Sequence, residues 1–386
     1  MKILHIGKFF HPYHGGMENF LTDLTLEQSL QGNDVSVLVH HHQPLAASTH
    51  SRTGAVEVTR MLSLGQLIYA PVSPSFGLHV RSLLSSFNPD VIHLHLPNLS
   101  AFWLLLQQTS TPMVVQWQSD VVRSKLDLRL SFLYPLYRIF EQKLIGLAQA
   151  VIVSSENYFM GSSVLWPHQD KCHTIPLGIN PTRVYKPIPE EIRDVKRRFG
   201  KPLVLSAGRF TYYKGFGYLI EAAVHIDEAV FVIVGDGPLR TRMLQKVKQS
   251  GLEKKVLLPG SLTNRELHTL MAACDVFALP SIERTESFGI VLLEAMIFGK
   301  PLITTDIEGS GVNWVNLAGE TGMVVRAADA DALADAIHYL LRNPETRLQM
   351  GERARDRLNN LFHIERVGQR IMDLYSTFQT PPLCGS

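Results

Sequence analysis

Short apolar runs alternate with longer amphipathic stretches along the first half of the chain. Residues 17–30 are one such stretch and have the spacing of a surface helix. Six runs have the length and composition of strands: KILHIG (2–7), DVSVLV (34–39), VEVTRML (56–62), DVIHLHL (90–96), PMVVQW (112–117) and AVIVSS (150–155). Strands that alternate with helices in this way are typical of a doubly wound parallel sheet.

The same alternation begins again after NPTRVYKPIPEE (180–191), which carries three prolines among polar residues and is expected to be a linker. Six more strands are predicted: PLVLSAG (202–208), AVFVIVG (229–235), KVLLPG (255–260), DVFALP (275–280), PLITT (301–305) and GMVVR (322–326). The pattern therefore predicts two α/β domains, residues 1–180 and 181–364. A terminal helical segment, 365–386, is expected to pack back on the first domain.

Composition narrows the class of protein. The 386 residues are 45% hydrophobic and 19% charged, as in a globular protein with two domains. A net charge of +2 does not indicate nucleic acid as the main partner. Three distant cysteines offer neither a disulfide framework nor a zinc site, and they fit a reducing cytosol. The N-terminus does not resemble a signal peptide, and no run of about 18 apolar residues occurs. We expect a cytoplasmic protein, soluble or peripheral.

Two glutamates stand out in SIERTESFGIVLLEAMIFGKPLI (281–303). Glu294 lies in an otherwise apolar helix, so we expect it to be buried and to need hydrogen-bond donors. The two hydroxyls of a ribose would supply them, and so would a backbone amide or an arginine. Glu286 lies on the preceding loop, where it could accept hydroxyl groups of a sugar or remain solvated.

Several backbone and basic groups are candidates for binding phosphate. The amides of Phe288, Gly289 and Ile290 open the helix and suit a diphosphate. GRFTYYKG (208–215) carries Arg209 and Lys214 after a predicted strand, and this pair could neutralise a leaving diphosphate or simply be solvated. GDGP (235–238) also ends a strand. It lacks the third glycine of a dinucleotide fingerprint, so a nicotinamide cofactor is not favoured.

The first domain offers its own candidates in HPYHGGMENF (11–20). Gly15 and Gly16 would let the backbone approach a ligand closely, and Glu18 lies in the first helical turn; a tight turn without a ligand is the alternative. Adjacent residues alternate faces, so His40, His41 and His42 cannot all bind one metal ion.

Read together, these motifs resemble the family-4 retaining glycosyltransferases. The resemblance rests on Gly15-Gly16 with Glu18, IPLGIN (175–180), GRF…KG (208–215), GDGP (235–238), LPGSL (258–262) and the glutamate pair of PSIERTESFGIVLLEAM. These motifs span nearly the whole chain, in order. The resemblance implies the GT-B fold, with two facing Rossmann-like domains and a cleft between them. It also implies transfer of a hexose from a nucleotide sugar to a sugar or lipid-linked glycan, as in polysaccharide synthesis.

The resemblance also implies roles for individual residues, with no metal ion and no cofactor. Glu286, Arg209 and Lys214 would be catalytic. Donor-binding positions would be Gly16, Gly237, Ser261, Leu262, Phe288, Gly289, Ile290 and Glu294. Acceptor-binding positions would be Glu18, Gln118 and Asp120.

The chain departs from the family pattern at two positions. Gln118 stands where the family often has histidine; it can hydrogen-bond a sugar hydroxyl but cannot supply imidazole chemistry. Asn180 replaces an aspartate, a milder change. The donor nucleotide is open, with GDP-mannose slightly favoured over a UDP-sugar.

Other readings of the sequence remain. A nucleotide-sugar epimerase, a glycoside hydrolase that uses both glutamates, or a non-catalytic binder would each account for part of the pattern. The segment Val121 to Ile145 mixes basic residues with aromatic and leucine side chains. It could lie on an anionic membrane surface or form an ordinary core-facing helix pair.

Overall fold

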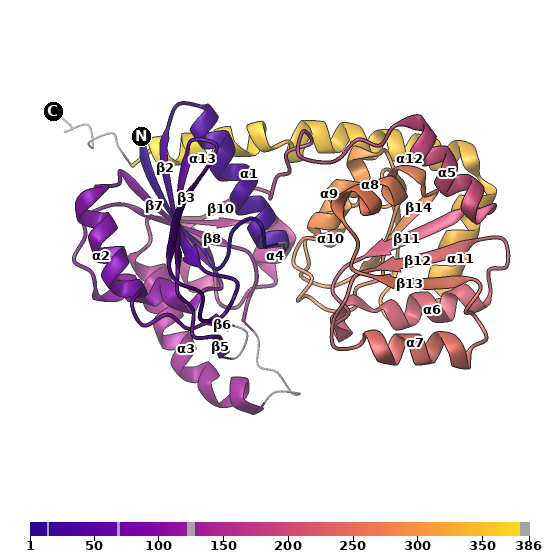
Figure 1. Ribbon diagram of the computed structural model, residues 1–386, viewed down its shortest axis with the longest axis horizontal. Helices are drawn as coiled ribbons and strands as arrows, with labels where there is room; N and C mark the ends of the chain where they lie inside the picture. The colour runs from indigo at the N-terminus through magenta and orange to yellow at the C-terminus, as the bar shows by residue number, and fades with distance from the viewer. Residues whose placement is uncertain (14, 68–69, 122–127, 379–386) are drawn as a thin grey trace. The chain divides into compact units, whose positions relative to one another are not determined.

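The chain forms two compact α/β units in a computed structural model that describes residues 1–13, 15–67, 70–121 and 128–378; the side chains at 67, 70 and 128–131 are outside this description (Figure 1). Unit 1 comprises Met1–Gly178 and Ile364–Ser386, and unit 2 comprises Ile179–His363. The sequence placed these boundaries after residues 180 and 364.

Unit 1 contains an eight-stranded sheet that is parallel except for one edge strand. The strand order is β10-β9-β8-β7-β1-β2-β4-β3, and β3 pairs antiparallel with β4. All six strands predicted in this half are confirmed: β1 (Lys2–Ile6), β2 (Asp34–His40), β4 (Val56–Met61), β7 (Val91–Leu96), β8 (Met113–Trp117) and β9 (Ala150–Val153). The sequence missed β3 (Thr49–Thr53), β10 (Cys172–Thr174) and the short pair β5 (Gln66–Leu67) and β6 (Ala70–Pro71). These strands are short or largely exposed, so they lack the apolar run that marks a buried strand.

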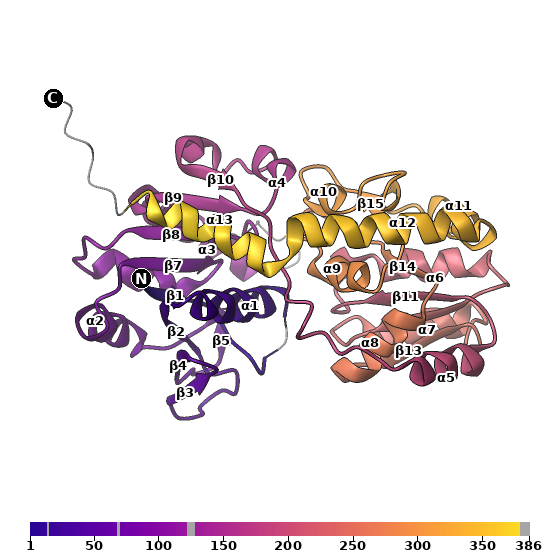
Figure 2. The same cartoon turned by 90° about the horizontal axis from the view of Figure 1, so that it is seen from above.

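Helices cover the sheet of unit 1, and one of them comes from the end of the chain. They are α1 (Gly16–Leu30), α2 (Phe76–Ser86), α3 (Leu128–Leu147), α4 (Glu156–Met160) and α13 (Ile364–Ser376), with 3-10 turns η1 (Leu99–Leu106) and η2 (Trp166–Lys171). Helix α13 packs against α1 (Figure 2). Arg370 of α13 donates to the Thr174 carbonyl at 2.7 Å, which ties it to β10 as well.

Unit 2 contains a six-stranded sheet that is parallel throughout. Its order is β13-β12-β11-β14-β15-β16, and all six predicted strands are confirmed: β11 (Leu203–Ala207), β12 (Val230–Val234), β13 (Val256–Gly260), β14 (Val276–Leu279), β15 (Leu302–Asp306) and β16 (Gly322–Arg326). The helical elements are α5 (Pro189–Phe199), η3 (Tyr212–Lys214), α6 (Phe216–Val224), α7 (Arg240–Gln249), α8 (Asn264–Ala273), α9 (Ile290–Ile297), α10 (Val312–Val315), α11 (Ala330–Arg342), α12 (Pro344–Arg357) and η4 (Leu358–Phe362).

The predicted linker, 180–191, is too long by three residues. Pro189 begins α5, because proline at the first helical position has a suitable φ and lacks an amide that the helix would leave unpaired. The Glu191 carboxylate accepts from the Ile188 amide at 2.9 Å and so caps the same turn.

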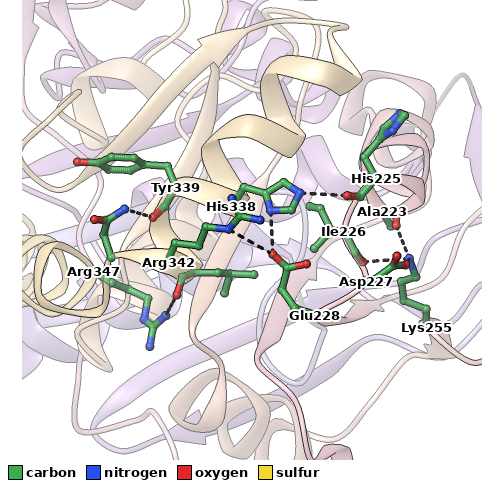
Figure 3. Close-up of polar contacts among 12 residues, drawn as sticks. Ala223, His225, Ile226, Asp227, Glu228, Lys255, His338, Tyr339, Arg342 and Arg347 are labelled. Carbon is green, nitrogen blue, oxygen red and sulfur yellow. Dashed lines mark hydrogen bonds and ion pairs between the residues drawn. The ribbon is translucent and has the colours of Figure 1, made fainter.

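Polar contacts fix α11 to the rest of unit 2. Nε2 of His338 lies 3.0 Å from the His225 carbonyl, and Nδ1 lies 2.8 Å from the Glu228 carboxylate (Figure 3). Lys255 donates to Asp227 at 2.9 Å and to two carbonyls at the end of α6, those of Ala223 and Ile226. These bonds tie the end of α6 and the turn after it to Lys255, the residue before β13.

The strand order reverses once in each sheet. In unit 2 the reversal lies between β11 and β14, and in unit 1 it lies between β1 and β7. At such a switch point the connections leave to opposite faces of the sheet, so the loops after the two central strands leave room for a ligand. In each unit, a ligand site is therefore expected at the carboxyl ends of the two strands that flank the reversal.

Histidines are buried in the core of unit 1 next to its switch point. His5 on β1 and His93 on β7 are register partners, and His95 follows on the same face of β7. Burial lowers the pKa of His5 to about 4, opposed by its hydrogen bond to Gln28. Burial also lowers the pKa of His40 to about 4, and it holds the pKa of His93 and His95 well below the usual range. All four are therefore neutral in the folded protein at pH 7.

These lowered pKa values predict that unit 1 loses stability in mild acid. Below about pH 6.5 the unfolded chain takes up protons that the folded histidines refuse, so the free energy of unfolding falls until the pH reaches about 4. Each such histidine contributes a slope of up to about 1.4 kcal/mol per pH unit. Urea unfolding between pH 7 and 4 measures this slope. His40→Gln should reduce it by about one histidine's share, and an unchanged slope would contradict the burial argument.

Candidate functional site

A buried ion pair lies at the switch point of unit 2. Nζ of Lys214, after β11, is 2.5 Å from Oε2 of Glu286, after β14, and the two side chains are 11% and 10% exposed. Ser281 donates to the same oxygen at 2.9 Å. Burial lowers the pKa of Lys214, but the Glu286 carboxylate outweighs it and leaves the pKa above its ordinary value. The site therefore holds a permanent cation against a carboxylate.

Close backbone contact brings these two loops together. Gly215 has φ +64°, and a Cβ there would lie 2.0 Å from the Pro280 carbonyl oxygen. The Ile282 amide donates to the Tyr213 carbonyl at 2.7 Å across the same contact. Only glycine fits at position 215, and its absence of a side chain lets Lys214 reach Glu286.

The GDGP segment (235–238) packs against the loop after β11 that carries Lys214. A Cβ on Gly237 would lie 2.8 Å from both the amide nitrogen and the carbonyl oxygen of Phe210, and the Phe210 amide donates to the Asp236 carbonyl at 2.9 Å. Arg209 is exposed beside this contact. The structure therefore brings the predicted residues Arg209, Lys214, Gly237 and Glu286 to one edge of the sheet.

Helix α9 begins beside Glu286. Gly289 caps it with φ +76°, and Phe288 is buried against Phe362, with ring centroids 5.9 Å apart. The amides at the start of a helix have no carbonyl partner within it, so Phe288, Gly289 and Ile290 present donors here. The α9 N-terminus is suited to an anion.

Glu294 is half-buried rather than buried, which corrects the sequence expectation. Because nearly all residues of α9 are apolar, the sequence did not show which face of the helix carries Glu294. Leu292, Leu293, Ala295 and Met296 face the core, whereas Glu294 shares a half-exposed face with Ile290, Val291 and Ile297. Residues three and four apart lie on one face of a helix, so Glu294 points along the surface that starts at the α9 N-terminus.

The predicted base-contacting residues follow the edge strand β13. Ser261 is exposed and Leu262 is half-buried. Both therefore lie at the carboxyl edge of the sheet of unit 2, where β11 and β14 also end.

In unit 1, Gly15 makes room for a carboxylate of the protein itself. Glu18, in the first turn of α1, is 7% exposed, and a Cβ on Gly15 would lie 2.2 Å from its Oε2. Burial raises the pKa of Glu18, while a hydrogen bond from its own amide and the charge of Lys8 oppose the increase. Gly16 is exposed at the helix start. Gly15 thus makes room for the Glu18 carboxylate, and Gly16 leaves the start of α1 exposed.

Asp120 has structural partners. Its Oδ1 accepts from the Trp117 indole at 2.8 Å and from the Ser162 hydroxyl at 2.9 Å, and its amide donates to the Tyr158 phenol oxygen at 2.6 Å. These bonds fix the turn after β8. Gln118, in the same turn, is 3% exposed, and its Nε2 lies 3.4 Å from Nδ1 of His95.

The sequence interpretation missed Ser281 and the three buried histidines of the unit 1 switch point. His93 and His95 alternate with apolar residues in DVIHLHL, and His5 interrupts KILHIG; polar residues on one face of two central strands were the available signal. In the described ranges, these three residues form the one histidine group compact enough for a metal ion, with ligand atoms within 4.8 Å of one another.

The adjacent triplet His40, His41 and His42 does not form such a group. His40 is bonded to Ser100 at 2.8 Å, while the rings of His41 and His42 stack on each other.

Apolar side chains are exposed on α3 and η1. Phe132, Leu136 and Ile139 share one face of α3 and are 84%, 54% and 53% exposed. A shallow groove beside them is lined by Leu99, Phe102, Trp103, Leu105, Leu106 and Phe140. Residues 122–127 of the predicted membrane segment lie outside the described residues. Across the part of the chain that the structure describes, no helix is both long and apolar enough to cross a bilayer.

Known proteins share this architecture. The sucrose-phosphate synthase of Thermosynechococcus elongatus superposes with a TM-score of 0.81 at 23% identity, over 98% of each chain. The Anabaena protein HepE, solved with UDP, gives a TM-score of 0.74 at 20% identity, over 98% of this chain and 100% of its own. Both are GT-B proteins, so the GT-B fold is confirmed.

Sequence comparison defines the family. Residues 14–183 match the profile of Glycosyltransferase Family 4, and residues 188–357 match that of Glycosyl transferases group 1. The O-antigen chain mannosyltransferase C of Escherichia coli is 30% identical over 98% of each chain. The D-rhamnosyltransferase WbpZ of Pseudomonas aeruginosa is 30% identical over 94% of this chain and 92% of its own. With both profiles matched in order and this full-length similarity, the chain belongs to glycosyltransferase family 4.

Proposed function

We propose that the protein transfers a hexose from a nucleotide sugar, bound by unit 2, to a glycan acceptor bound by unit 1, with retention of anomeric configuration and without a metal ion. The observation that supports this most is the buried Lys214–Glu286 pair beside the α9 N-terminus. Together they offer a cation and free amides for a diphosphate, and a carboxylate for sugar hydroxyls.

The donor would occupy the carboxyl edge of the sheet of unit 2. Glu294 would accept hydrogen bonds from the ribose, and backbone groups at Ser261 and Leu262 would contact the base. The two bonds that Glu286 receives from Lys214 and Ser281 both use Oε2. Its Oε1 is the oxygen we assign to a hydroxyl of the donor sugar.

Catalysis would rest on neutralising the leaving diphosphate. As the glycosidic bond to phosphate breaks, negative charge grows on the diphosphate. Lys214, Arg209 and the amides of Phe288–Ile290 would stabilise this charge, and donors that are fixed before the reaction need little rearrangement to do so. On unit 1, Gly16 would contact phosphate, and Glu18, Gln118 and Asp120 would surround the acceptor.

The identity of the sugar is inferred from the relatives. One full-length relative is a mannosyltransferase and the other a D-rhamnosyltransferase. D-rhamnose is 6-deoxy-D-mannose, so both act on sugars with the manno configuration. We therefore favour a donor with a manno-configured hexose, and GDP-mannose over a UDP-sugar.

Two alternatives would use the same residues. A glycoside hydrolase needs two carboxylates on opposite sides of one bond, about 5–10 Å apart. Glu286 is instead bonded to an ammonium and a hydroxyl, which does not favour this function. An epimerase would convert the donor with no acceptor present.

We also propose that unit 1 docks on an anionic membrane through the exposed face of α3. Phe132, Leu136 and Ile139 supply apolar anchors, and the exposed Lys143 supplies positive charge on the same helix. The acceptor would then be a lipid-linked glycan at the cytoplasmic face; the relative that is named for O-antigen chains supports a glycan-chain acceptor.

Arg209→Ala is the sharpest test of the transfer mechanism, because Arg209 is exposed and its loss leaves no buried charge behind. Removing such a charge contact should lower kcat for sugar transfer about 100-fold. Glu286→Ala and Lys214→Ala should do the same, although each also removes half of a buried pair. Arg326→Ala, an exposed arginine that ends β16 in the same sheet, is the matched control. Full activity of Arg209→Ala, Glu286→Ala and Lys214→Ala would rule out the site. Release of free sugar from an oligosaccharide in the absence of any nucleotide would favour a hydrolase.

Nucleotide choice can be measured by thermal shift. If the donor is GDP-mannose, GDP and GDP-mannose should raise the melting temperature, because a ligand that binds only the folded state stabilises it by mass action. Ligand at 100 times its Kd adds about 2.7 kcal/mol of unfolding free energy. Stabilisation by UDP and none by GDP would reverse the assignment.

Flotation with liposomes that contain anionic lipid tests membrane docking. The wild-type protein should float at low salt, and Phe132→Ser/Leu136→Ser/Ile139→Ser should not. Leu348→Ser, which removes a 62%-exposed leucine from α12 of unit 2, is the control and should float like the wild type. Wild-type protein that stays in the soluble fraction would exclude docking and favour a soluble acceptor.

A further inference from the structure

A line of buried hydrogen bonds runs from Gln118 into the core of unit 1. Nε2 of Gln118 lies 3.4 Å from Nδ1 of His95, and Nε2 of His95 lies 3.0 Å from Nδ1 of His5. Nε2 of His5 then lies 2.7 Å from Oε1 of Gln28 on α1. All four side chains are at most 3% exposed, so water does not compete for these bonds.

The direction of this line follows from what each atom can do. The Gln28 oxygen only accepts, so His5 must carry its proton on Nε2. A neutral imidazole has one proton, so Nδ1 of His5 is an acceptor and His95 must donate from Nε2. By the same reasoning, Nδ1 of His95 is an acceptor, and only the amide nitrogen of Gln118 can donate to it.

The consequence is a fixed orientation of the Gln118 carboxamide. Its nitrogen is directed to His95, so its oxygen is directed elsewhere. In the residues that the structure describes, that oxygen is buried and has no hydrogen-bond partner. A buried acceptor without a partner destabilises the folded protein, and a donor group of a ligand would remove that penalty. Gln118 directly follows β8, at the carboxyl edge of the sheet where ligands of this fold bind.

We propose that His5 and His95 are positioning residues that hold Gln118 with Oε1 ready to accept a hydrogen bond from a hydroxyl group of the sugar acceptor. The inference rests on the proposed function for the identity of that ligand. It gives the buried histidines a role without proton transfer. It also accounts for a carboxamide at position 118, because one rigid planar group then offers a donor to His95 and a carbonyl oxygen to the acceptor sugar.

A metal ion explains the cluster less well. The partners of these imidazoles are two amides, the phenol of Tyr375 and one another, and each is neutral. Five of the six ring nitrogens of His5, His93 and His95 already have hydrogen-bond partners, so a metal ion would have to displace these bonds to be coordinated.

The tautomers can be read directly in the resting protein. With ¹⁵N-labelled histidine in the full-length chain, His5 and His95 should each show a protonated Nε2 and a bare Nδ1, assigned by single variants. This measurement does not depend on the reaction. A protonated Nδ1 on either residue would overturn the inference, and so would a shift of all three histidine signals on addition of zinc.

Two amide variants separate positioning from general damage to the core. The oxygen of asparagine can take the place of Nδ1, whereas the amide of glutamine reaches the place of Nε2. His95→Asn should therefore keep the contact to Gln118, and His95→Gln should lose it. We expect His95→Gln to raise KM for the acceptor about tenfold, the value of one neutral hydrogen bond. KM for the donor should not change, and His95→Asn should stay close to the wild type.

His93→Gln is the matched control. It alters an equally buried histidine on the same strand, whose ring stacks on His95 but whose hydrogen bond is to Tyr375; KM for the acceptor should stay constant because the bond from Gln118 to His95 is kept. Equal acceptor KM values for His95→Asn and His95→Gln would refute the positioning role while leaving the transferase intact. Absence of any sugar transfer by the wild-type protein would refute the proposed function instead, and the tautomers would still decide the orientation of Gln118. If the His95 variants fail to fold, the tautomers of His5 and His95 in the wild-type protein still decide the orientation of the Gln118 carboxamide.

Discussion

Close backbone contact between two loops is the constraint on which the donor half of the protein depends. Gly215 and the Pro280 carbonyl touch at a distance that excludes any side chain, and this contact sets Lys214 against Glu286. Neither charge would be tolerated there alone, since a buried ion without a partner is costly. The strand order makes the contact possible, because β11 and β14 are neighbours in space although 68 residues separate Ala207 from Val276, the end of one strand and the start of the other. Fold and site are thus specified by the same few positions.

The two units use buried polarity in different ways. Unit 2 pairs full charges at its switch point, which suits a ligand that carries phosphate. Unit 1 places neutral imidazoles and amides at the equivalent point, where direction of donation rather than charge is controlled. Such a network restricts the orientation of each member, because reversing one amide leaves a neighbour unpaired. This difference is consistent with one unit that handles a charged donor and another that handles hydroxyl groups.

Sequence reasoning predicted twelve strands of the two large sheets, because near-continuous apolar runs are visible without any structure. The edge strand β3, THSRT, has no such signal, and its pairing is decided by the neighbouring β4. Among site residues, the glutamate spacing was informative, but the burial of Glu294 was misjudged because one helical face of α9 is half-exposed. The Lys214–Glu286 contact could not be predicted, because it depends on the positive φ of Gly215. The sequence shows a glycine at this position but not the backbone angle that it adopts. The histidine cluster was missed because its members come from strands that are adjacent in space and distant along the chain.

The contribution of α13 to unit 1 has a consequence for synthesis. Tyr375 bonds to His93, so the core of the first unit contains a residue translated 282 positions later. Unit 2 is contiguous and has all of its sheet once residue 326 has left the ribosome. The first unit must wait, with the surface that α13 covers exposed, until the last helix emerges. The unit that begins the chain is therefore the later of the two to reach its final structure, because the helix that covers α1 is made after the whole of unit 2.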